Sequence, residues 1–117
     1  MIKRLMTLAL MSFVITSCAD TNQKQSETDR INDWFSVQFE EQVSLSPIFA
    51  TSLGRKTNYD QIDDFSEAGQ AADLLWLQET VTDLRASFTY DMLSEDAKVS
   101  YDLWVYQYDK AKALEPY

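Results

Sequence analysis

The chain has 117 residues, which is the length of one domain of ordinary size. Its 10 basic and 19 acidic residues give a net charge of −9, which argues against nucleic acid and other partners bound through phosphates. The 2 Gly and 2 Pro are few for the turns of a many-stranded sheet, so composition favours helices. His is absent, which removes the commonest zinc ligand and general base, and no catalytic, metal-binding or cofactor-binding residue is assigned.

Residues 1–17 have the pattern of a secretory signal peptide. Lys3 and Arg4 precede an uncharged run over 5–15, which is too short to span a bilayer. The run ends in the sequence ITSC, which resembles the lipobox of bacterial lipoproteins. This resemblance implies cleavage before Cys18 and lipidation of Cys18. The alternative, a short buried or membrane-lying helix with an incidental Cys, leaves the charged start and the small-residue stop unexplained.

Lipidation implies that Cys18 anchors the mature chain in the lipid bilayer of the bacterial cell envelope. The next residue is Ala19 and not the Asp that retains such lipoproteins at the inner membrane of enteric bacteria, so an outer-membrane lipoprotein facing the periplasm is expected. Residues 18–28 contain no large apolar side chain and are predicted as a flexible, solvated tether.

The remaining residues, 29–117, predict an all-α fold of three main helices and one short helix. The first long helix is predicted over 29–45, where apolar residues recur at helical spacing after the N-cap candidates Ser26 and Thr28.

The short helix is predicted next, with two turns. Ser46 and Pro47 form a cap-then-Pro start, and Gly54 is placed to end the helix in a left-handed conformation. Residues 55–65 have no sustained period and are predicted as a loop.

Two further long helices follow. Ser66 is expected to cap a helix over 67–86, whose apolar residues step by three and four. Residues 87–93 connect it to a helix over 95–114, capped by Ser94 and followed by acidic residues that suit the positive end of the helix dipole.

The helix over 95–114 has two apolar faces. One face holds Ala97, Tyr101, Trp104, Val105, Tyr108 and Ala111, and the other holds Val99, Leu103, Tyr106, Ala113 and Leu114. Such a helix is expected to be sandwiched between two layers, so the remainder of a larger domain or a protein partner should pack against it. The alternative is a loosely packed three-helix bundle that leaves its tyrosines half exposed.

The sequence from 30 to 114 resembles the DUF885 family of bacterial proteins, many of them lipoproteins. The resemblance rests first on the segment PxxATxLG and four residues shortly after it: Pro47, Ala50, Thr51, Leu53 and Gly54, then Tyr59, Asp60, Asp64 and Ser66. It rests also on the segments LRA and LSEDAKVSYDL, which lie within 84–103.

This resemblance implies a large, almost wholly helical domain related to zincin-type metallopeptidases, with an HExxH zinc helix far downstream. That helix is absent from this sequence, so the chain alone is not expected to be an enzyme, and zinc would belong to a full-length protein. The resemblance implies an amino-terminal scaffold. The alternative is a free-standing helical lipoprotein module that binds a protein partner in the periplasm through Tyr101, Trp104 and Tyr108.

Two other clusters suggest binding sites and are interpreted as structural. Asp60, Asp63 and Asp64 could gather a hard cation, but the order of an EF-hand loop is absent; a solvated loop, in which Asp64 positions the next helix start, is expected. The three Trp residues could form a ligand cage, but at helical spacing they are expected in the core; they are Trp34, Trp76 and Trp104.

Overall fold

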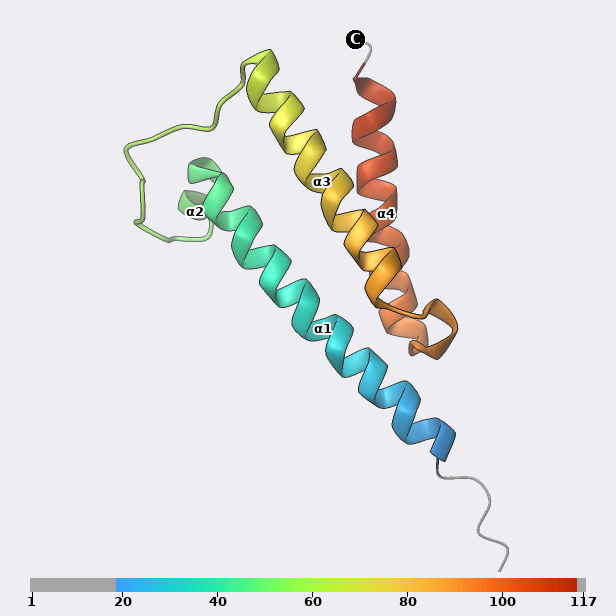
Figure 1. Ribbon diagram of the computed structural model, residues 1–117. Helices are drawn as coiled ribbons and strands as arrows, with labels where there is room; N and C mark the ends of the chain where they lie inside the picture. Colours follow the sequence, from blue (N-terminus) through green and yellow to red (C-terminus); the bar gives the residue numbers. More distant parts are fainter. Residues whose placement is uncertain (1–18, 116–117) are drawn as a thin grey trace, which may run out of the picture.

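The computed structural model describes residues 19–115, with side chains from residue 26 onward (Figure 1). The described part contains helices and no strand, which confirms the all-α prediction of three long helices and one short one. In chain order the elements are α1 (Ala19–Leu45), α2 (Pro47–Ser52), α3 (Glu67–Ser87), the 3-10 helix η1 (Tyr90–Met92) and α4 (Glu95–Leu114).

The helices α3 and α4 form an antiparallel hairpin, and α1 runs beside it with α2 folded back at its far end (Figure 1). We call the end of the bundle that holds the α3–α4 connection, residues 88–94, the closed end. The opposite end contains the start of α3, the end of α4 and the connection over 53–66, and we call it the open end. The two ends differ in how well the side chains are covered.

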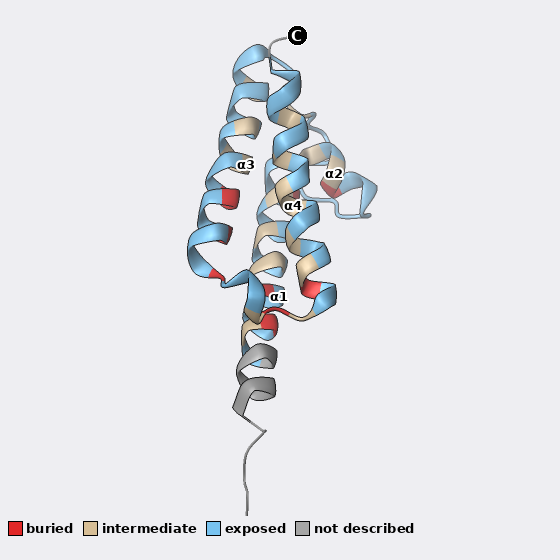
Figure 2. Cartoon of the chain, turned by 90° about the vertical axis from the view of Figure 1, so that its right-hand side faces the viewer, coloured by how far each residue is buried: buried red, intermediate tan, exposed pale blue. Residues whose placement is uncertain are grey.

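The core lies at the closed end. Ile31, Leu84 and Leu93 are fully buried there, and Phe88 and Ala97 join them. Figure 2 shows buried residues toward this end and one on α2, whereas residues 67–79 of α3 and 98–115, which hold most of α4, contain none. Val43 on α1 and Ala50 on α2 are buried apart from this core. Burial of apolar surface is the main favourable term in folding, so the closed end supplies most of the stability of the described chain.

The first helix begins earlier than predicted. The structure places α1 from Ala19, so residues 19–28 are helical where a flexible tether was expected, and Ser26 and Thr28 are not N-caps. The Thr28 side chain is 7% exposed, and its Oγ1 accepts a hydrogen bond of 2.9 Å from the backbone N–H of Ser94. Glu27 Oε1 likewise accepts one of 3.1 Å from the backbone N–H of Thr89. The polar residues of this segment therefore hold the α3–α4 connection instead of solvating a linker.

The other predicted helix starts are confirmed. The hydroxyl oxygens of Ser46, Ser66 and Ser94 each accept a hydrogen bond from the backbone N–H three residues later, at 3.0, 3.1 and 3.4 Å. Pro47 occupies the first turn of α2, where its missing N–H costs nothing. Gly54 has a φ of +77°, the left-handed conformation expected after the short helix.

Candidate functional site

The two apolar faces of α4 have different environments. The inner face packs against the core, where Ala97 is buried and Tyr101, Trp104 and Val105 are partly buried. We define the outer face of α4 as Val99, Leu103, Tyr106, Ala113 and Leu114. All five are exposed: Val99 to 68%, Leu103 to 54%, Tyr106 to 56% and Leu114 to 65%, together with Ala113. No element among residues 19–115 covers the outer face.

Trp34 and Trp104 are half-buried against the core, close to the prediction, whereas Trp76 is half-buried beside Trp104 and is not among the residues packed on the core. The ring of Trp104 lies 5.5 Å from that of Trp34 and 6.1 Å from that of Trp76, both in edge-to-face geometry. Trp104 Nε1 donates to Thr80 Oγ1 at 3.0 Å, and Trp34 Nε1 donates to Asp83 Oδ2 at 2.6 Å. The Trp76 Nε1 is buried without a hydrogen-bond partner among the described residues. Because Trp34 and Trp104 are engaged within the bundle, the inner face that holds Tyr101 and Trp104 is not a free surface for a partner.

The aspartates of the 53–66 connection fix helix starts. Asp63 Oδ2 accepts a hydrogen bond of 2.6 Å from the Ser46 hydroxyl, and Asp63 Oδ1 accepts one of 3.0 Å from the Ile48 N–H. Asp64 Oδ1 accepts one of 2.9 Å from the Ser66 N–H, which confirms that Asp64 positions the start of α3. Hydrogen bonds from the hydroxyl and the backbone N–H of Ser66 hold the pKa of Asp64 below its usual range.

Gly69 allows this connection to lie close to the first turn of α3. A Cβ added at Gly69 would come within 2.1 Å of the backbone oxygen of Asp64, so any side chain would displace the loop. This requirement was not predicted from the sequence, although a Gly three residues after a Ser cap indicates it.

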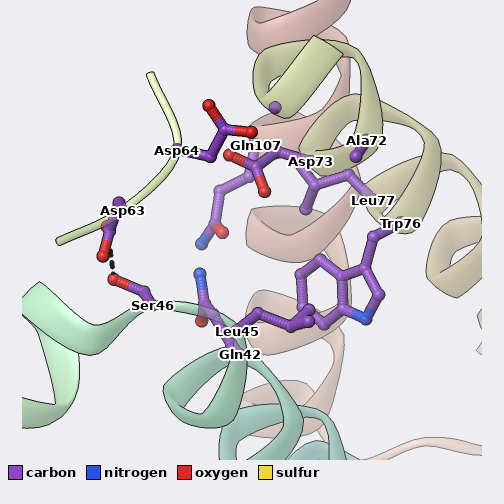
Figure 3. A pocket seen from close by; sticks show the side chains of 11 residues that line it. Gln42, Leu45, Ser46, Asp63, Asp64, Ala72, Asp73, Trp76, Leu77 and Gln107 are labelled. Carbon is purple, nitrogen blue, oxygen red and sulfur yellow. Dashed lines mark hydrogen bonds between the residues drawn. The ribbon is translucent and has the colours of Figure 1, made fainter. Parts of the chain in front are cut away.

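A hollow of about 510 Å³ opens at the open end (Figure 3). Its lining comes from the end of α1, the 53–66 connection, the start of α3 and the middle of α4; the residues are Gln42, Leu45, Ser46, Asp63, Asp64, Gly69, Ala72, Asp73, Trp76, Leu77 and Gln107. This hollow could not be predicted from the sequence, because the lining residues lie on segments far apart in the chain and no local motif joins them.

The described residues do not fit a zinc site. Residues 19–115 contain no group of three or more Cys, Asp or Glu side chains that could hold a metal ion, and the whole chain contains no His. The predicted lipidation site, Cys18, lies outside the described residues. Among the described helices, none is long and apolar enough to cross a membrane.

Comparison with known protein families identifies a match over more than half of the chain. Residues 47–116 match the sequence model of DUF885, whose description is "Bacterial protein of unknown function". The chain belongs to the DUF885 family. The match covers α2, the 53–66 connection, α3, η1 and α4. No curated protein and no solved structure matches the chain.

The structure explains several residues on which the family resemblance rests. Pro47 starts α2, Ala50 is buried against the bundle, and Gly54 ends the turn. Asp64 and Ser66 together cap α3. These residues therefore shape the turn between α1 and α3, and none of them has a demonstrated chemical role.

Proposed function

We propose that this chain is the amino-terminal scaffold of a membrane-anchored DUF885 lipoprotein, a metallopeptidase-like hydrolase whose HExxH helix lies outside this sequence. The observation that carries the proposal is the uncovered outer face of α4. The hydrolase class rests on the family resemblance stated in the sequence analysis, since the matched family model is itself described as being of unknown function.

The outer face supports the scaffold role through its pattern and its exposure. Val99, Leu103 and Tyr106 repeat at helical spacing on a helix whose opposite face is packed, and more than half of each side chain is in contact with solvent. Contiguous exposed apolar patches on soluble proteins mark surfaces that another structure covers. Further helices of the same domain would cover this one and would make α4 an internal helix.

Catalysis is assigned to no described residue. Zinc ligands in hydrolases are His, Asp, Glu and Cys side chains that converge on one point, and residues 19–115 present no such group. The contribution of this chain is to position the start of the domain and to present α4 for packing.

The anchor is the second part of the proposal. Acylation of Cys18 would tie the chain to the outer membrane, with the bundle facing the periplasm, because each buried acyl CH₂ contributes about 0.8 kcal/mol to membrane binding. The α1 backbone is helical from Ala19 onward. The bundle would then be joined to the anchored residue by a helix and not by a flexible linker.

The scaffold role is tested by the accessibility of the outer face. Leu103→Cys in a Cys18→Ser background should react rapidly with a thiol reagent in the 117-residue chain. In the polypeptide translated from the whole reading frame, the reaction should be at least about tenfold slower, because packed side chains react only after local opening. Asp33→Cys, on the exposed side of α1, is the control and should react equally in both. Equal rates at Leu103→Cys, or a reading frame that stops after Tyr117, would contradict the proposal.

The anchor is tested separately in cells. Wild-type protein should carry a fatty acid on Cys18 and sediment with outer membranes, whereas Cys18→Ser should remain uncleaved or unlipidated. Wild-type protein found soluble in the periplasm with Met1 intact would end the lipoprotein part of the proposal and leave the scaffold part standing.

A further inference from the structure

The hollow at the open end collects polar side chains that have no partner within the described chain. Gln42 comes from α1, Asp73 from α3 and Gln107 from α4, and none of the three makes a hydrogen bond or an ion pair with any residue in the range 26–115. Figure 3 shows the side chains of Gln42, Asp73 and Gln107 among those that line the hollow. Gln42 is half-buried and Asp73 and Gln107 are exposed, so three helices bring to one place polar groups that only solvent contacts in the described chain.

The side chains that line the hollow carry a net negative charge. Asp63, Asp64 and Asp73 line it, and no Lys or Arg does. The ion pairs of the described chain lie elsewhere, at Glu27–Arg30, Glu40–Arg55 and Glu95–Lys98. Asp63 and Asp64 already accept hydrogen bonds from helix starts, so Asp73 is the carboxylate free to bind a cation.

One wall of the hollow is apolar. Trp76, Leu77 and Leu45 line it beside the polar groups, and the Trp76 ring borders the space in Figure 3. A bare metal ion gains no binding energy from contact with such an apolar wall. A ligand that carries a positive head on an alkyl stem satisfies both parts, since the stem covers the apolar wall while the head meets the carboxylate.

We infer that the open-end hollow binds an alkylammonium or alkylguanidinium group. The Asp73 carboxylate accepts charge-assisted hydrogen bonds from the nitrogen head, the amide oxygens of Gln42 and Gln107 accept further N–H groups, and the stem packs on Trp76 and Leu77. The volume of about 510 Å³ is large enough for one such group. This inference concerns the described residues alone and does not depend on the anchor or on catalysis elsewhere in the family.

The test is a titration of the full 117-residue chain with butylguanidinium. Binding is detected as a change in the NMR chemical shift of the Trp76 indole N–H. Saturable binding is expected for butylguanidinium and for butylammonium, and none for the neutral analogue butylurea. Equal binding of butylurea, or a shift that never saturates, would overturn the inference.

Variants assign the binding to Asp73. Asp73→Asn should weaken butylguanidinium binding at least about tenfold, because a charge-assisted hydrogen bond is lost. Asp33→Asn removes the same charge from the exposed side of α1 and should leave the affinity unchanged. Gln107→Glu adds a carboxylate to the hollow and should tighten binding, which keeps the test decisive if Asp73→Asn unfolds the chain. Equal weakening by the two Asp→Asn variants would overturn the inference.

A final comparison identifies the source of the ligand group. The peptide acetyl-Gly-Arg-Gly-amide presents the same guanidinium on a protein backbone. Binding of the peptide at least as tight as that of butylguanidinium supports an Arg or Lys side chain of a protein segment as the occupant. Binding of butylguanidinium alone supports a free small amine or guanidine. Failure of both would overturn the inference, and the proposed scaffold role would be unaffected.

Discussion

The closed end and the open end of the bundle are built from the same helices but differ in how far their side chains are buried. At the closed end, Leu84 and Leu93 are fully buried and the side chains of Glu27 and Thr28 accept hydrogen bonds from the backbone of the α3–α4 connection. At the open end, Leu75 on α3 and Leu114 on α4 are more than half exposed. Apolar periodicity continues along α4 through both regions, so the difference lies in what covers the helices and not in the helices themselves.

The largest effect is expected from removing a core side chain at the closed end. Leu93→Ala should lower the free energy of unfolding by about 2–5 kcal/mol, because it leaves a cavity in the best-packed region. Leu75→Ala, the same substitution at a half-exposed site of the open end, should cost less than about 1 kcal/mol. Urea unfolding monitored by circular dichroism measures the loss in free energy of unfolding for each variant. Equal losses would remove the distinction between the two ends.

A smaller loss is expected at the contact between α1 and the connection. Thr28→Val keeps the shape of the side chain but removes the acceptor for the Ser94 N–H, and a buried donor left without a partner costs about 1–3 kcal/mol. Thr28→Ser retains the hydroxyl and is the matched control. If Thr28→Val and Thr28→Ser unfold at the same urea concentration, this hydrogen bond does not hold the closed end together.

At the open end, the capping carboxylate of Asp64 should give a stability that depends on pH. Its pKa in the folded chain lies below 3.8, the usual Asp value, so its contribution is present above that pH and is lost as the pH falls through the lowered pKa. Thermal melts of wild type and Asp64→Ala should therefore differ near neutral pH and converge in strong acid. A difference that stays constant down to about pH 2 would show that the charge of Asp64 has no part in capping α3.

The smallest effect on stability is expected on the outer face of α4. Leu103→Gln should change the free energy of unfolding of the 117-residue chain by no more than about 0.5 kcal/mol, because Leu103 is more than half exposed. The same substitution should reduce binding of an apolar dye and any self-association, which size-exclusion chromatography and dye fluorescence measure. A loss above about 2 kcal/mol would mean that the outer face is buried in the 117-residue chain.

Features governed by residues close together in the chain were predictable from the sequence. The starts of α2, α3 and α4 followed from Ser46, Ser66 and Ser94, because a Ser cap acts on an amide only three residues away. The two faces of α4 followed from its apolar period in the same way.

Features made by distant residues were not predictable. The start of α1 was placed too late because Glu27 and Thr28 act on Thr89 and Ser94, more than sixty residues further along the chain. Taken by themselves, residues 19–28 contain no large apolar side chain and therefore predict a linker. The hollow was missed for the same reason, since Gln42, Asp73 and Gln107 have no relation in sequence that would bring them together.

The early start of α1 has a mechanical consequence. A helix rises about 1.5 Å per residue, so the 27 residues of α1 form a strut of roughly 40 Å. A pull applied at its amino-terminal end is carried along the backbone to Glu27 and Thr28, which are joined to the α3–α4 connection. Tension on this end would therefore reach the best-packed part of the bundle through these two hydrogen bonds.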